Sequence, residues 1–211
     1  MAKRNSWTTR IAIGAVLLLV LGWLFMRSVR DVRSTPYTVR AADLQGWQVV
    51  TGGDSDAMVG LQPPSSLTAD LFKQVFARNM ESITSPASPQ IPVILRIEAG
   101  GLNTQAAPIA SIITEAGLGS SPLAPTCFGT RRTAPPASHD YYFIHFEAAP
   151  FVTARARLRD ALQAQGADVS GFDPNDLQST LVIATSDPAV RSTLPFEFDP
   201  SRDCVAPVSV E

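Results

Sequence analysis

The chain contains few of the residue types that build metal sites and catalytic centres. It has two cysteines and two histidines among 211 residues, and neither cysteine belongs to a C-x-x-C pair. A G-x-S-x-G serine-nucleophile motif is absent, and the nearest segment, residues 117–121, does not fit its spacing. That segment also lacks the lysine of a phosphate-binding loop. The sequence therefore predicts no assembled catalytic set, no metal site and no cofactor.

Residues 34–211 contain a single lysine, Lys73. Residues 34–211 hold eleven Lys and Arg against eighteen Asp and Glu, a formal charge of −7. Such a surface repels phosphate backbones, so we expect no nucleic-acid partner. Residues 1–33 hold six Lys and Arg and one acid, Asp31. We expect this excess of basic residues to be attracted to anionic lipid headgroups.

One uninterrupted apolar run, residues 11–26, lies between basic flanks. Its sixteen residues fall a little short of the ~20 that a membrane-spanning helix needs, but flanking arginines can snorkel and tryptophans suit the two interfaces. A cleaved signal peptide is the alternative. The residues at the C-terminal end of the run are bulky or cationic, however, and do not contain the small residues of a cleavage site. The sequence predicts a transmembrane signal-anchor helix in contact with lipid. The residues assigned to it are Ile11, Met26, Trp7, Trp23, Arg10 and Arg27.

This anchor divides the chain into four parts. A basic tail covers residues 1–10, the anchor 11–26, a juxtamembrane linker 27–36 and a globular domain 37–211. The charges on the two flanks nearly balance, so the positive-inside rule decides little. A short basic tail is usual for a signal-anchor, and a pair of cysteines suits an oxidising compartment. We expect a single-pass membrane protein whose globular domain is extracytoplasmic, for example periplasmic.

Cys127 and Cys204 are far apart in sequence. Outside the cytoplasm an even pair favours a structural disulfide over two free thiols. Closing a loop of this length removes on the order of 4 to 5 kcal/mol of unfolded-state entropy in the chain-entropy model. A reactive thiol or a metal ligand is the alternative reading of these cysteines.

Hydrophobic periodicity predicts an α+β domain with a mixed sheet and about three helices, with α/β as the alternative. Residues 117–138, rich in Gly and Pro, are expected to be irregular. Strands are expected at 37–40, 47–51, 57–61, 90–98, 139–147, 179–185 and 204–208, and helices at 67–83, 108–116 and 151–165.

Two pairs of polar residues are candidates for chemistry. His145 and Glu147 fall on one face of an extended strand, where they could act as an acid/base pair or half of a metal site. Asp54 and Asp56 resemble the D-x-D metal motif of glycosyltransferases, but a turn between two strands explains the same residues and is the interpretation we favour. On the helix at 151–165, Arg155 and Arg159 share a face that we interpret as solvated surface or as a contact for an acidic partner.

These features favour a non-enzymatic module, held at a membrane, that binds a protein partner or helps to assemble an envelope complex. The alternative is a membrane-tethered enzyme that acts on envelope glycan or peptide.

Overall fold

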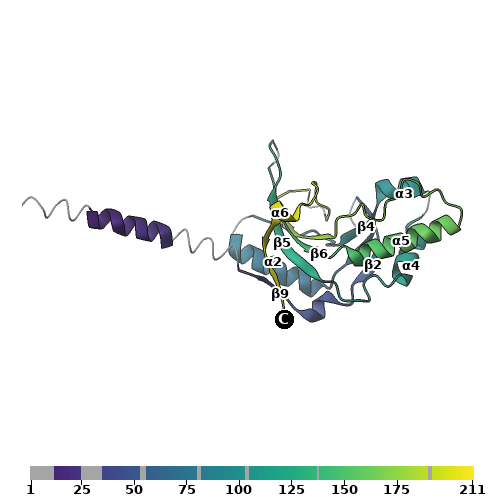
Figure 1. Ribbon diagram of the computed structural model, residues 1–211, viewed down its shortest axis with the longest axis horizontal. Coiled ribbons are helices and arrows are strands. Elements are labelled where there is room, and N and C mark those ends of the chain that lie inside the picture. The colour runs from purple at the N-terminus through teal and green to yellow at the C-terminus, as the bar shows by residue number, and fades with distance from the viewer. Residues whose placement is uncertain are drawn as a thin grey trace, which may run out of the picture. The chain divides into compact units, whose positions relative to one another are not determined.

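The computed structural model divides into two compact units, residues 1–35 and 36–211 (Figure 1). It describes residues 12–24, 35–52, 56–79, 82–102, 105–136, 138–189 and 192–211.

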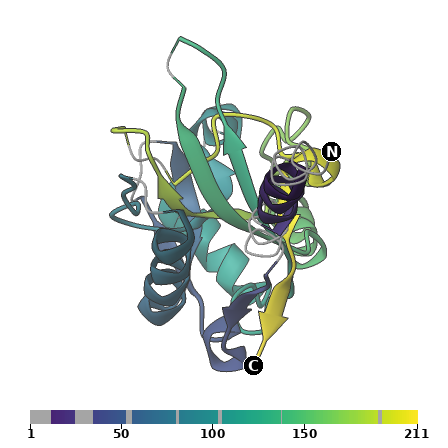
Figure 2. The same ribbon diagram turned by 90° about the vertical axis from the view of Figure 1, so that its left-hand side faces the viewer.

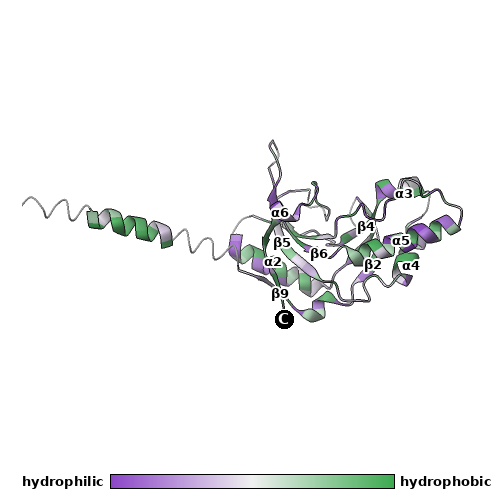
Figure 3. Cartoon of the chain, viewed as in Figure 1, coloured by the Kyte–Doolittle hydropathy of each residue, from purple (hydrophilic) through white to green (hydrophobic). Residues whose placement is uncertain are grey.

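In the first unit a helix covers residues 12–24, and Figure 3 shows it as apolar along its length. None of the helices in the described ranges is long and apolar enough to cross a membrane, so the predicted transmembrane helix is unsupported by the structure. Trp23 lies in this helix and is exposed. The other residues assigned to the anchor lie outside the described residues: Ile11, Met26, Trp7, Arg10 and Arg27.

The second unit has a mixed α+β architecture with three sheets (Figures 1 and 2), as the sequence predicts at the level of class. An antiparallel sheet has the order β7-β6-β5-β8, a second antiparallel sheet has the order β2-β3-β4, and β1 pairs in parallel with β9. The strands are β1 (Tyr37–Val39), β2 (Gln48–Thr51), β3 (Ala57–Gln62), β4 (Ile91–Leu95), β5 (Pro125–Arg132), β6 (Asp140–Phe146), β7 (Thr180–Thr185), β8 (Cys204–Ala206) and β9 (Val208–Val210).

The described part of this unit contains six helices rather than about three, because three short ones escape the periodicity analysis. The short helices are η1 (Ala41–Leu44), α3 (Arg96–Leu102) and α6 (Pro200–Asp203), and the longer ones are α2 (Ser65–Asn79), α4 (Ala106–Glu115) and α5 (Ala149–Ala164).

The strand predicted through Glu98 ends earlier, at Leu95. The Glu98 carboxylate accepts a hydrogen bond from the Leu95 backbone N–H at 2.7 Å, which satisfies a donor at the start of α3. The alternation of apolar residues across this segment therefore does not describe a strand face, and Ile97 is 84% exposed.

The two faces of the four-stranded sheet pack against different layers. Tyr142, Ile144 and Phe146 enter the main core with side chains from α2, α4 and α5. Tyr141 and Phe143 lie on the opposite face, in a smaller apolar cluster covered by the segment that precedes α6. The sheet is therefore buried on both faces, which explains why every residue of β7 is buried.

A buried guanidinium joins α5 to the three-stranded sheet and to the loop that precedes β7. Arg155 is only 1% exposed, so its interpretation as solvated helix surface is wrong. All of its N–H groups meet acceptors, and its guanidinium lies 4.5 Å from the Phe172 ring centroid. The acceptors are Glu98 Oε1 (2.6 Å), Val93 O (2.7 Å), Asp173 O (2.7 Å), Pro174 O (3.1 Å) and Asp176 O (3.1 Å).

The predicted disulfide is confirmed. Cys127 on β5 is bonded to Cys204 at the start of β8, with 5.7 Å between their Cα atoms and a sequence separation of 77. Because β8 contains only three residues, this covalent bond fixes a short edge strand that few backbone hydrogen bonds hold.

Replacing Arg155 by Met is expected to destabilise the domain strongly. The change removes the ion-pair partner of Glu98 and the donor of the buried Val93 and Pro174 carbonyl oxygens, at a cost of about 3 to 5 kcal/mol in the free energy of unfolding. Urea denaturation of the full-length chain in detergent measures this cost. Arg159→Met on the same helix is the control, and it should change stability by no more than about 0.5 kcal/mol because Arg159 is a surface residue. Equal effects of the two substitutions would contradict this account.

Removing both cysteines, as Cys127→Ala with Cys204→Ala, is expected to lower stability by about 4 kcal/mol in the chain-entropy model. Urea denaturation under non-reducing conditions gives the loss, and wild type measured with a thiol reductant should match the double variant. An intact-mass measurement after alkylation without reduction checks that the wild-type thiols are bonded. Identical urea midpoints for wild type and the double variant would rule out a stabilising role.

Candidate functional site: a proline-walled groove

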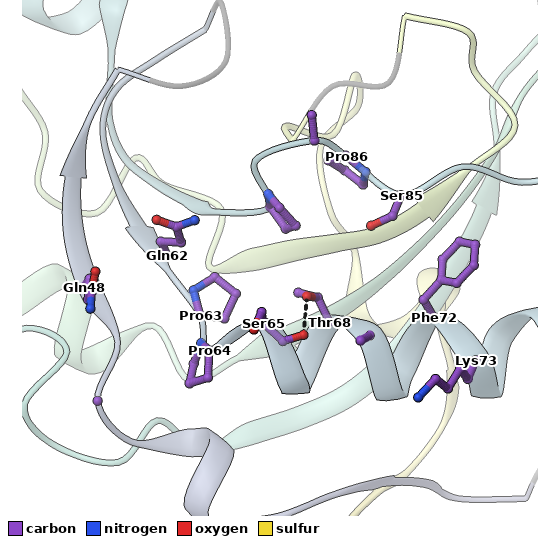
Figure 4. Close-up of a pocket in the computed structure, with 14 residues that line it drawn as sticks. Gln48, Gln62, Pro63, Pro64, Ser65, Thr68, Phe72, Lys73, Ser85 and Pro86 are labelled. Atoms are coloured by element: carbon purple, nitrogen blue, oxygen red, sulfur yellow. Dashed lines mark hydrogen bonds between the residues drawn. The ribbon is translucent and has the colours of Figure 1, made fainter.

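A groove of about 770 Å³ runs along the first half of α2. In Figure 4, Gln48 lies at one end of the groove, and Phe72 and Lys73 lie at the other. Side chains from α2 form one side, and the segment that contains Ser85 and Pro86 faces them. The lining residues come from three places: the ends of β2 and β3 (Gly46, Gln48, Gln62, Pro63, Pro64), α2 (Ser65, Thr68, Ala69, Phe72, Lys73) and the segment before β4 (Ser85, Pro86, Ala87, Pro89).

The wall before β4 is held at both ends. Thr84 exchanges two backbone hydrogen bonds with Thr185 of β7, at 2.8 and 2.9 Å. At the other end Gln90 is 1% exposed and lies against Gly60 of β3, where a Cβ atom would come within 2.2 Å of the Gln90 side-chain oxygen. Prolines within the wall restrict its backbone further. The groove is therefore largely preformed.

The chemistry of the lining is neutral except at one point. Amides and hydroxyls supply its polar groups, and prolines with Phe72 supply its apolar surface. Among the described residues that line it, Lys73 is the only charged one. The Phe72 ring also stacks with Phe76, with 6.3 Å between the ring centroids. Because Phe76 is 52% exposed, apolar surface continues from the groove along α2.

His145, the first candidate for chemistry, lies elsewhere in a closed network on β6. Its Nδ1 is 2.6 Å from the Thr126 hydroxyl, and its Nε2 is 3.3 Å from the Ser179 hydroxyl. The ring stacks on Phe198, with 4.2 Å between centroids. The Ser179 hydroxyl donates to the Phe146 carbonyl oxygen at 2.7 Å, so a neutral His145 with its proton on Nε2 satisfies every group.

Burial lowers the pKa of His145 below its ordinary value of about 6.5. The Thr126 hydroxyl that faces Nδ1 also lies 3.2 Å from the His145 carbonyl oxygen, to which it can donate. The imidazole therefore fills a structural position between β5, β6 and β7.

The other predicted candidates do not join His145. Glu147 lies beyond the end of β6 and is exposed, and no hydrogen bond links it to His145 among the described residues. Asp54 lies outside the described residues, whereas the Asp56 carboxylate accepts a hydrogen bond from the Thr193 hydroxyl at 3.1 Å. Within the described ranges, no cluster of three or more His, Cys, Asp and Glu could hold a metal ion.

A second cavity, of about 120 Å³, lies beside Arg155 and Glu98. It is well below the ~300 Å³ at which small-molecule sites begin. Its two charged residues already pair with each other at 2.6 Å. The groove is therefore a better candidate site than this small cavity.

The sequence does contain signals for the groove, although its residues were not predicted as a site. Pro63-Pro64 and the prolines at 86 and 89 flank α2 on both sides in sequence. Taken alone, each pair indicates a turn or a helix start. Only the pairing of Thr84 with β7 brings the second pair opposite the helix that follows the first.

His145→Gln is expected to flatten the pH dependence of stability. Because folding lowers the His145 pKa, its contribution is complete above about pH 6.5 and is lost as pH falls through the folded-state pKa. Wild type should therefore lose more stability than the variant between about pH 7.5 and 5. Urea unfolding across this range measures the difference, and the values near pH 8 give the cost of the replacement itself. Parallel pH curves would contradict the assignment.

Comparisons with protein-family models, with curated proteins and with solved structures found no match for this chain. Function is therefore argued from the geometry and chemistry of the groove.

Proposed function

We propose that residues 37–211 form a non-enzymatic binding module whose groove along α2 takes a segment of a protein partner. The observation that carries this proposal is the groove itself, because it encloses about 770 Å³ and its lining is neutral apart from Lys73. Preformed concave sites with an apolar surface and a few polar groups are typical of ligand binding. Amide and hydroxyl groups can both donate and accept hydrogen bonds, so they suit a peptide backbone.

We propose further that residues 11–26 hold this module at a membrane as a single-pass signal-anchor. The apolar run, its arginine flanks and Trp23 support the anchor. The Cys127–Cys204 disulfide supports an extracytoplasmic domain, because such bonds persist in oxidising compartments. A module tethered in this way would act in the assembly of an envelope complex rather than on nucleic acid.

The alternative function, an envelope enzyme that uses His145, has less support. A general base needs a partner whose proton it can take. The Ser179 hydroxyl next to His145 is buried and donates its proton to the Phe146 carbonyl oxygen. The Thr126 hydroxyl also contacts the ring, at 2.6 Å from Nδ1. Among the described residues no carboxylate is hydrogen-bonded to His145, so the ring has no second catalytic group to orient it.

Blocking the groove is expected to abolish binding without unfolding the chain. Ala69 is exposed and lines the groove, so Ala69→Trp fills it. The probe is a library of random dodecapeptides displayed on phage, selected against the full-length protein in lipid nanodiscs. Selected peptides should bind the Ala69→Trp variant about tenfold or more weakly, equivalent to about 1.4 kcal/mol, when titrated by calorimetry.

Ala77→Trp is the matched control, because Ala77 is an exposed alanine of α2 that does not line the groove. Its affinity should equal that of wild type. Failure to select any peptide would overturn the proposal. So would selected peptides that bind the Ala69→Trp variant as tightly as wild type.

A further inference from the structure

The single lysine of residues 34–211 lies in the groove. The domain has a formal charge of −7, and Lys73 is the only lysine among its eleven basic residues. The Lys73 side chain is 76% exposed at the rim of the groove. A cation placed at a concave site in an otherwise acidic domain attracts a ligand carboxylate, because the rest of the surface repels it.

The charged neighbours of Lys73 leave much of its ammonium group available. Its Nζ lies 3.5 Å from Asp70 Oδ1. Asp70 makes a shorter contact, 3.0 Å, with Arg40. Arg40 in turn is bonded to Asp43 at 2.8 Å. An ammonium group carries three donors, so one long contact with a shared carboxylate leaves donors that can reach a ligand.

The rest of the lining limits what the ligand carries beside its carboxylate. Gln48 and Gln62 are cross-strand partners at the end opposite Lys73 and Phe72. Between the two ends lie hydroxyl groups and the faces of prolines. A polyanion such as nucleic acid needs several cations in register, and this lining offers one. A neutral, extended chain with a single acid matches it.

We propose that the groove binds an extended segment of a partner protein in which one Asp or Glu side chain pairs with Lys73. The acid belongs to a side chain rather than to a chain end. Lys73 lies at an exposed rim, whereas terminal carboxylates are captured by clustered backbone N–H groups. This inference rests on the proposed binding function and adds the chemistry of its ligand.

Selection of the same dodecapeptide library on charge variants of Lys73 tests the proposal. Peptides selected on the full-length wild type in nanodiscs should share an Asp or Glu at one position. Lys73→Arg should keep that preference, and Lys73→Glu should replace it with Lys or Arg. In calorimetry, changing the shared acid to its amide should weaken binding to wild type about threefold to fivefold, as expected for an exposed ion pair.

A double-mutant cycle separates this inference from the function on which it rests. The Lys73→Met variant should weaken binding of the acidic peptide by the same factor and should lose nothing further with the amide peptide. Additive losses, or an acidic preference that survives Lys73→Glu, would overturn the inference while the Ala69→Trp result still supports a binding groove. Insensitivity to Ala69→Trp would overturn both. Binding of a glycan array, with no peptide selected, would also overturn both.

Discussion

The architecture of the domain depends on one buried cation. The Arg155 guanidinium gathers carbonyl oxygens from β4 and from the loop before β7, together with the Glu98 carboxylate at the start of α3. Without this residue the Glu98 carboxylate would lose its ion pair, and the Val93 and Pro174 carbonyl oxygens would lose a buried donor. One side chain of α5 thus joins the three-stranded sheet, α3 and the loop before β7.

The groove depends on how the two antiparallel sheets are placed relative to each other. Its segment before β4 runs from Thr84, paired with β7, to Gln90, packed beneath β3. The two sheets must therefore already be positioned before this wall can stand opposite α2. A site held in this way has little conformational entropy to lose when a ligand binds, which favours affinity from a modest contact surface.

The sequence predicts the periodic elements well and the polar contacts poorly. α2, α5 and β6 have strong apolar spacing, and the cysteine pair has few alternatives. β5 escapes because Gly129 reads as a turn residue, whereas its missing side chain makes room for the Phe143 ring, 2.3 Å from the place of a Cβ. Arg155 and Arg159 have equivalent positions in the helical repeat. Only the loop before β7, which covers Arg155, distinguishes them. The groove forms because Thr84 pairs with Thr185, far away in sequence, and local sequence patterns do not predict such a pairing.

The start of the domain is bonded directly to the helix that lines the groove. β1 is the first strand of the domain, and its Thr38 exchanges two hydrogen bonds with Gln74 of α2, at 2.9 and 2.8 Å. Arg78, also on α2, donates to the Pro36 carbonyl oxygen at 2.8 Å. Tension applied to the chain before Pro36 therefore enters a strand that is bonded to the groove helix on one side and to the final strand on the other. Gln74 and Arg78 pass that tension to the helix that lines the groove, while Tyr37 and Val39 of the same strand pass it to the core.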